Sequence, residues 1–145
     1  MSKEIHPLGD RGMPWEVSQG FGENEAVYKA YGMRGHNGVD YPAPEGTLVR
    51  ATHAGHVLYA GEGENHPLLG SAAGYAVLVE DEAGGYITGY AHLRQVWCGT
   101  GVDVKAGQVI GSVGSTGMAT GPHLHYEVIA LPLEMDNGFL GRIEP

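Results

Sequence analysis

Apolar and polar positions alternate with a period of two along much of this chain, a pattern typical of β-strands. Five such stretches are rich in β-branched and aromatic residues, and glycine, aspartate, asparagine or proline separates them. They are residues 56–60, 75–80, 86–93, 107–114 and 123–129. The turn-forming sequence DEAGG between the second and third stretches predicts that these two form a β-hairpin.

Two segments depart from the alternation. Residues 23–31 (ENEAVYKAY) lie between glycines and predict one short helix. Residues 62–74 (EGENHPLLGSAAG) are polar and are interrupted by Pro67 and three glycines, which favours an exposed, inserted loop. Neither a linker nor a low-complexity tract divides the chain, so we expect one domain over residues 1–145, with residues 1–15 as an N-terminal extension.

Glycine turns recur in a way that hints at symmetry. Residues 43–57 (APEGTLVRATHAGHV) and 102–114 (VDVKAGQVIGSVG) echo one another, since each places a glycine turn before a valine-rich strand. This echo is a weak sign of internal duplication. The chain has 25 glycines and 8 prolines among 145 residues, yet 42% of its residues are hydrophobic, which is typical of a compact, turn-dense β protein.

Charge and cysteine content narrow the function classes. The net charge is −9 and only eight residues are lysine or arginine, which argues against nucleic-acid binding. No stretch has the roughly 18 apolar residues of a membrane span, and the first residues lack the apolar centre of a secretion signal, so export would need another route. The single cysteine, Cys98, cannot close an intrachain disulfide and is expected to be a small buried hydrophobic residue.

Eight histidines raise the question of a metal site. Four of them have no neighbours that favour one: His6 lies in the N-terminal extension, His53 and His56 flank a turn, and His66 lies in the inserted loop. We expect these four to be solvated side chains.

The sequence HLH places two histidines on one face of a strand. His123 and His125 would lie about 6.6 Å apart, at roughly 3.3 Å per residue. Either both bind one ion, or one binds the ion and the other faces a ligand of that ion, and the spacing leaves both options open. Glu127 continues this face and would either orient a metal-bound imidazole or serve as a structural carboxylate at the far rim.

Two further segments of the chain offer possible metal ligands. On a flat strand His36 and Asp40 would lie about 13 Å apart, but the intervening Asn37-Gly38 favours a kink that turns both side chains toward a common point. His92 follows Tyr86, Thr88 and Tyr90 at alternate positions, and this polar stripe fits a groove better than a core. Three imidazoles and one carboxylate could thus converge. Catalytic zinc sites use three such ligands, although two histidines and one carboxylate also describe a non-haem iron site.

Four motifs in a fixed order together resemble a known family. They are HNGVD (36–40), APEGTLVRATHAGHV (43–57), YAHL (90–93) and VKAGQVIGSVGSTGMATGPHLHYE (104–127). The chain resembles the zinc endopeptidases of the lysostaphin and LytM type, which cut peptide cross-links in bacterial peptidoglycan. The resemblance extends from VSQGFGEN (17–24) through HLHYEV (123–128), most of the chain.

The resemblance implies a fold, a site and a reaction. The fold would be all-β, mainly an antiparallel sheet with loops walling a cleft, of the duplicated hybrid motif type, with at most one or two short helices. One Zn²⁺ would be bound by His36, Asp40 and His125. His92 and His123 would stand beside the reacting water and shuttle its proton or stabilise the oxyanion. The substrate would be a stem or cross-bridge peptide of peptidoglycan.

Departures from the family's commoner form leave parts of this picture open. Residues 22–35 and 62–74 are lengthened, so a preference such as pentaglycine cleavage cannot be transferred. The chain would act at the bacterial cell wall, in the periplasm or outside the cell. Without a signal peptide, it fits a phage lysin released through a holin, or a virion-carried enzyme, as well as a bacterial housekeeping hydrolase. Two rival functions are a non-catalytic wall-binding or hydrolase-activating module and, with a poorer fit, an iron oxygenase.

Overall fold

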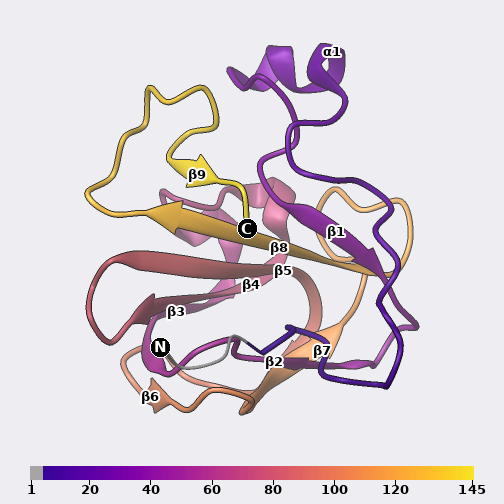
Figure 1. Cartoon of the computed structure of the whole chain (residues 1–145), viewed down its shortest axis with the longest axis vertical. Helices are drawn as coiled ribbons and strands as arrows, with labels where there is room; N and C mark the ends of the chain where they lie inside the picture. The colour runs from indigo at the N-terminus through magenta and orange to yellow at the C-terminus, as the bar shows by residue number, and fades with distance from the viewer. Residues whose placement is uncertain (1–4) are drawn as a thin grey trace.

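The computed structural model describes residues 5–145, and their dominant feature is one antiparallel sheet of nine strands (Figure 1). The strands are β1 (Val39–Pro42), β2 (Leu48–Arg50), β3 (Gly55–Glu62), β4 (Tyr75–Asp81), β5 (Tyr86–Val96), β6 (Asp103–Val104), β7 (Val109–Val113), β8 (His123–Ala130) and β9 (Arg142–Ile143). The helical elements are α1 (Glu25–Tyr28) and the short 3₁₀ turns η1 (Lys29–Tyr31), η2 (Gly63–Asn65) and η3 (Ser71–Ala73). The expected all-β class and the short helix after residue 23 are confirmed.

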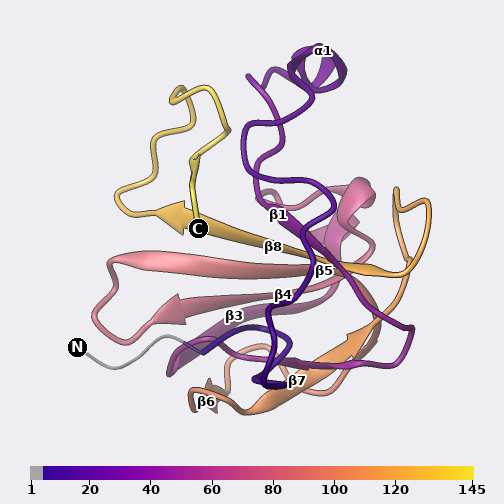
Figure 2. The same cartoon turned by 45° about the vertical axis from the view of Figure 1, so that its right-hand side comes forward.

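The strand order places the first strand beside a late one, since β1 pairs with β8. The main path is β1-β8-β5-β4-β3-β6, while β7 pairs with β2 and β5, and β9 pairs with β8. Figure 2 shows β1 lying against β8, with β5, β4 and β3 following in turn. The hairpin predicted at DEAGG joins β4 and β5. The two echoing glycine-turn segments lie next to each other as well, because β2 and β7 pair with Val49 opposite Gly111.

The hydrophobic core lies between the faces of this curved sheet. Its fully buried members include Val49, Val57, Val77, Val79, Leu93, Ile110, Val113 and Leu124. The central strands β4, β5 and β8 are buried at consecutive positions, and Leu78, Ile87 and Ile129 form a second, smaller cluster. Cys98 packs against this cluster but is half-buried, not the buried residue that was expected. None of the helices formed by the described residues is long and apolar enough to cross a membrane.

A hydrogen-bonded set of polar side chains lies inside the core, and it corrects two expectations. His53 is only 6% exposed, and its Nε2 pairs with Thr88 Oγ1 at 2.8 Å, so it is not a solvated side chain. Thr88 donates to the hydroxyl of Tyr90, which also pairs with Thr52 Oγ1. The polar stripe on β5 is therefore core and not the wall of a groove. Its hydroxyls are buried at little cost because each has a partner.

The other three histidines outside the predicted site differ among themselves. His56 has an exposed side chain, as expected. His66 is partly buried, and its Nδ1 accepts a hydrogen bond from the Leu68 N–H at 3.1 Å. His6 is also partly buried, and its ring lies edge-on to Tyr41 with centroids 4.6 Å apart. The expectation that His6 and His66 are solvated side chains was therefore wrong.

Residues 62–74 form an ordered loop with internal contacts. Gly63 donates to the carbonyl oxygen of Gly74 at 2.7 Å and accepts from the N–H of Gly70 at 3.0 Å, which closes the loop at its base. Leu68 and Leu69 pack against a second, smaller core cluster. The loop is thus exposed in part, as predicted, but it is attached to the sheet by apolar contacts.

Candidate metal centre

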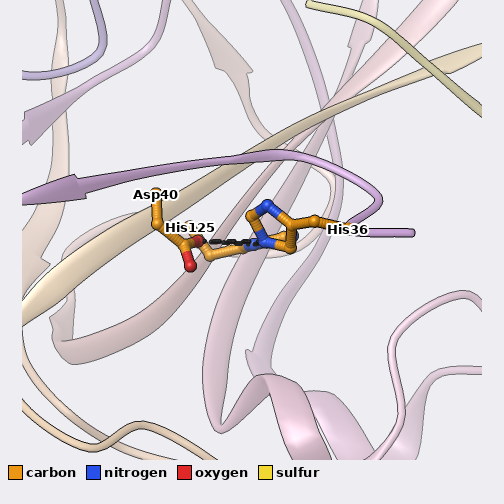
Figure 3. Close-up of side chains that lie close together, drawn as sticks. All are labelled: His36, Asp40 and His125. Atoms are coloured by element: carbon orange, nitrogen blue, oxygen red, sulfur yellow. Dashed lines mark hydrogen bonds and ion pairs between the residues drawn. The ribbon is translucent and has the colours of Figure 1, made fainter. Parts of the chain in front are cut away.

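Three predicted ligands come together where β1 pairs with β8. Asp40 and His125 face each other directly in the register of these strands. His36 lies just before β1, and a bend at residues 37–38 turns its ring back toward Asp40. The kink predicted there therefore brings His36 Nε2 to 3.2 Å from Asp40 Oδ1. Figure 3 shows both imidazoles and the carboxylate converging on one point.

The three facing atoms form a nearly equilateral triangle. His125 Nδ1 lies 3.0 Å from Asp40 Oδ1 and 3.1 Å from His36 Nε2. Tetrahedral Zn²⁺ with bonds of 2.0–2.1 Å would separate its ligand atoms by about 3.3 Å, so small shifts would accommodate the ion. His36, Asp40 and His125 are also the group of described residues whose ligand atoms all lie within 4.8 Å of one another. Both the donor set and the spacing therefore fit zinc.

The imidazoles of His36 and His125 are each oriented by an acceptor on the nitrogen that faces away from the triangle. His36 Nδ1 lies 3.2 Å from the carbonyl oxygen of Gly20, and His125 Nε2 lies 3.2 Å from Glu127 Oε1. With these N–H groups donating, His36 Nε2 and His125 Nδ1 are the ring atoms left to face a metal. Of the two roles considered for Glu127, the geometry matches the one that orients an imidazole.

The charges of His125 and Asp40 stabilise each other. Burial opposes protonation of His125, but its hydrogen bonds to Asp40 and Glu127 outweigh that effect and raise its pKa to about 9. Burial also opposes ionisation of Asp40, yet hydrogen bonds from His125 and His36 hold its pKa well below the usual range. Without a metal, His125 is thus a cation paired with carboxylates, and a bound ion would replace its Nδ1 proton.

The remaining two predicted site residues, His92 and His123, stand beside the triangle. Their ring centroids are 4.8 Å apart, and His123 Nε2 lies 3.7 Å from Asp40 Oδ2. His92 Nδ1 lies 2.8 Å from the carbonyl oxygen of Thr116, and His123 Nδ1 lies 2.9 Å from that of Gly121. Because both Nδ1–H groups donate to carbonyls, both Nε2 atoms are left as proton acceptors.

His92 has a lowered pKa and an uncommon backbone conformation. Burial and then the neighbouring charge of His125 lower its pKa to about 4, so it is neutral at pH 7 and can accept a proton. Its φ of 62° belongs to the left-handed region, which is uncommon for residues other than glycine. A β-bulge accounts for this, since Tyr75 pairs with Leu93 while Val77 pairs with Tyr90, so that β5 has one residue more than β4.

Both lengthened segments border the site. The ring of Tyr28, from residues 22–35, lies 5.5 Å from that of His36 between centroids. On the other side, Thr116 and Gly117 share a cavity of about 220 Å³ with the inserted loop. Its other lining residues are Glu62, Gly63, Glu64, Ser71, Gly74 and Tyr75. Because the Thr116 carbonyl holds His92, this cavity adjoins the paired histidines.

Some contributors could not be identified from the sequence. Gly20, Thr116 and Gly121 act through backbone carbonyls, which no side-chain pattern reveals. Arg142 was missed too, although it is only 4% exposed and its Nε donates to Glu127 Oε2. A usable signal was that Arg142 is the only arginine after Glu127 in the chain.

Comparisons with known proteins agree with this arrangement. Residues 34–136 match the model of peptidase family M23. The chain is 46% identical over 92 residues to the DD-carboxypeptidase/endopeptidase Mpg of Neisseria meningitidis, covering 63% of this chain and 19% of that protein. It is 36% identical over 115 residues to the peptidoglycan DD-endopeptidase ShyA of Vibrio cholerae, covering 79% of this chain and 25% of that protein. The chain thus spans about a fifth to a quarter of these relatives.

Solved structures match over nearly the whole chain. The catalytic domain of lysostaphin, an antimicrobial peptidase from Staphylococcus simulans, superposes with a TM-score of 0.73 at 28% identity and covers 90% of this chain and 89% of that one. The catalytic domain of the prophage-encoded M23 protein EnpA from Enterococcus faecalis gives a TM-score of 0.72 at 28% identity, covering 99% and 95%.

Proposed function

The chain belongs to peptidase family M23, and from that premise we propose that it is a zinc-dependent endopeptidase that hydrolyses stem or cross-bridge peptides of bacterial peptidoglycan. The observation that carries the proposal is that two pairs of histidines, one beside Asp40 and one next to it, lie at the same place in the fold. The ligand atoms of His36, Asp40 and His125 converge on one point, and the rings of His92 and His123 stand together beside that group.

In this proposal the ligands are His36 Nε2, Asp40 Oδ1 and His125 Nδ1. A bound Zn²⁺ supplies a Lewis acid that polarises a scissile carbonyl and makes water nucleophilic near neutral pH. The Nε2 atoms of His92 and His123 accept the proton of the attacking water and return it to the leaving amine. Whichever of the two is protonated donates a hydrogen bond to the developing oxyanion.

The substrate class follows from the relatives. ShyA is named as a peptidoglycan DD-endopeptidase, and lysostaphin is described as an antimicrobial peptidase. We propose that a peptide lies across the paired histidines, with one flank along the cavity between Thr116 and the inserted loop. The lengthened walls of this site are the reason to expect a cross-link preference of its own.

The test is digestion of purified sacculi by the Zn²⁺-loaded protein. Mass spectrometry of the released fragments identifies the bond that is cut, and sacculi from several wall types give the specificity. Parallel digestions with the chelated protein and with His92→Ala supply the controls. Binding to sacculi without release of fragments would instead support the non-catalytic module. Iron instead of zinc, in elemental analysis of protein purified without added metal, would contradict the zinc assignment.

We also propose that the protein reaches the wall by phage-mediated release, either through a holin or on the virion. The similarity to the prophage-encoded EnpA over nearly its whole catalytic domain supports this origin. Expression in the bacterial cytosol should leave cells intact until a holin or a solvent opens the membrane, and turbidity should then fall. Lysis without permeabilisation would contradict the proposed route.

A further inference from the structure

We propose that Arg142 is a positioning residue for the metal centre, acting through Glu127 on the ring of His125. Arg142 lies on β9, outside residues 34–136 that match the family model. Its Nε donates to Glu127 Oε2, while Glu127 Oε1 lies 3.2 Å from His125 Nε2. The chain of contacts therefore runs from the guanidinium through both carboxylate oxygens to the imidazole.

Burial makes this chain of contacts necessary. Arg142 and Glu127 are each 4% exposed, so the Glu127 carboxylate has little access to water. A buried carboxylate needs a charged or hydrogen-bonded partner for each oxygen, and Arg142 is the permanently charged partner of this one. With Oε2 held by Arg142, Oε1 is fixed as the acceptor of the His125 N–H, which directs His125 Nδ1 toward Asp40.

The same guanidinium also attaches the inserted loop. Nη2 donates to the carbonyl oxygen of Leu68 in that loop, and Nη1 donates to that of Leu140 at 2.8 Å. Each nitrogen of Arg142 thus binds a different segment: β8, the inserted loop and the turn before β9. The planar fork of arginine spreads its donors over three nitrogens, whereas the three donors of lysine share one nitrogen and would not reach three segments placed in this way. One side chain therefore fixes both the orientation of a proposed metal ligand and the position of the inserted loop that lines the cavity.

This inference rests on the proposed zinc site, and it is tested by metal affinity and not by turnover. The dissociation constant for Zn²⁺ is measured by chelator competition at pH 7.5 on folded protein, with circular dichroism to verify the fold. We expect Arg142→Lys and Arg142→Met to weaken binding by about 10- to 100-fold, as changes behind a metal ligand do. The visible spectrum of the Co²⁺-loaded variants should change as well, because it reports ligand geometry. Arg50→Lys is the matched control, since Arg50 donates to the Gly107 carbonyl by one Nη and touches no ligand.

A double-mutant cycle separates positioning from general stabilisation. If Arg142 acts through Glu127, then Glu127→Gln combined with Arg142→Met should bind Zn²⁺ about as weakly as Glu127→Gln alone. This double variant leaves no unpaired buried charge, so it can be measured even where Arg142→Met alone does not fold. Parent-like affinity in Arg142→Lys, or a double variant whose loss equals the product of the two single losses, would overturn the inference. A parent that binds no Zn²⁺ would overturn the proposed function together with it.

Discussion

Gly38 lies directly against the ring of His125. A Cβ at Gly38 would come within 2.7 Å of His125 Cε1 and 2.4 Å of the carbonyl oxygen of Tyr126. Only a residue without a side chain allows β1 and β8 to approach this closely beside the ligand. The glycine of the Asn37-Gly38 pair therefore serves close packing more than the turn for which it was singled out in the sequence.

Substitution of this glycine should disturb both fold and metal. We expect Gly38→Ala to destabilise the protein by about 1–3 kcal/mol, as overpacking does, and to weaken Zn²⁺ binding by displacing His125. Denaturant unfolding and chelator competition measure the two effects. Gly99→Ala is the control, because a Cβ there meets nothing within 4 Å. Equal results for the two variants would show that the contact at Gly38 is unimportant.

Substitution of a proposed metal ligand and of a proposed base should affect metal content and activity differently. His125→Ala should lose metal and activity together, since it removes one corner of the ligand triangle. His92→Ala should keep Zn²⁺ and lose about 10²- to 10⁴-fold in turnover, the usual contribution of a proton-transfer group. Metal content by elemental analysis and fragment release from sacculi are compared, with the exposed His56→Ala as control. A His92 variant that digests sacculi at the parent rate would refute the role assigned to His92.

Stability in mild acid should depend on His6. Burial, and then the charge of Arg11, hold the pKa of His6 below its ordinary 6.5. The folded protein therefore binds this proton less readily than the unfolded chain does, so the contribution is complete above about pH 6.5 and is lost as the pH falls below it. His6→Asn keeps an acceptor for the Leu8 N–H without the titration.

We expect the free energy of unfolding to decline less between pH 7.5 and 5.5 in His6→Asn than in the parent. Urea unfolding of the metal-free protein at both pH values measures this difference. His56→Asn, a change at an exposed histidine, is the control. An identical decline in the His6 variant and the parent would contradict the prediction.

Metal removal should lower stability as well as activity. Binding that is confined to the folded state adds about 2.7 kcal/mol when the free ion is at 100 times its dissociation constant. A chelator should therefore lower the Tm of the parent, and Zn²⁺ should restore it together with sacculus digestion. In His125→Ala the Tm should respond much less to either addition. A parent Tm that ignores both additions would indicate that no ion is bound at this triangle.

The sequence was sufficient for the five longest strands and for the convergence of five site residues, because both depend on local patterns and an ordered set of motifs. The four short strands β1, β2, β6 and β9 were not among the predicted stretches. The sequence also failed at Tyr90 and Thr88, which alternate with apolar residues as a solvent-facing stripe would. Their hydroxyls are instead paired within the core, and the bulge at His92 removes that histidine from their face. Pairing partners and bulges arise from neighbouring strands, so the pattern of one strand cannot reveal them.

Contacts made by residues near the two ends of the chain were harder still to predict from the sequence. His6 packs on Tyr41, and Arg142 reaches Glu127, through contacts between segments that share no sequence signal. Backbone acceptors such as the Thr116 carbonyl carry no residue preference at all. These contacts exist only once the chain has folded, which is why they emerge from the structure alone.

The direct pairing of Asp40 with His125 has a consequence for how the chain reaches its native state. Side chains of a strand alternate between faces, so a slip of β1 against β8 by one residue would leave Asp40 and His125 on opposite faces of the sheet. In such a misaligned sheet the three side chains could not bind one ion together. An ion at this point would stabilise only the native register of two residues that are 85 positions apart in the sequence, and so would select against misaligned sheets during folding.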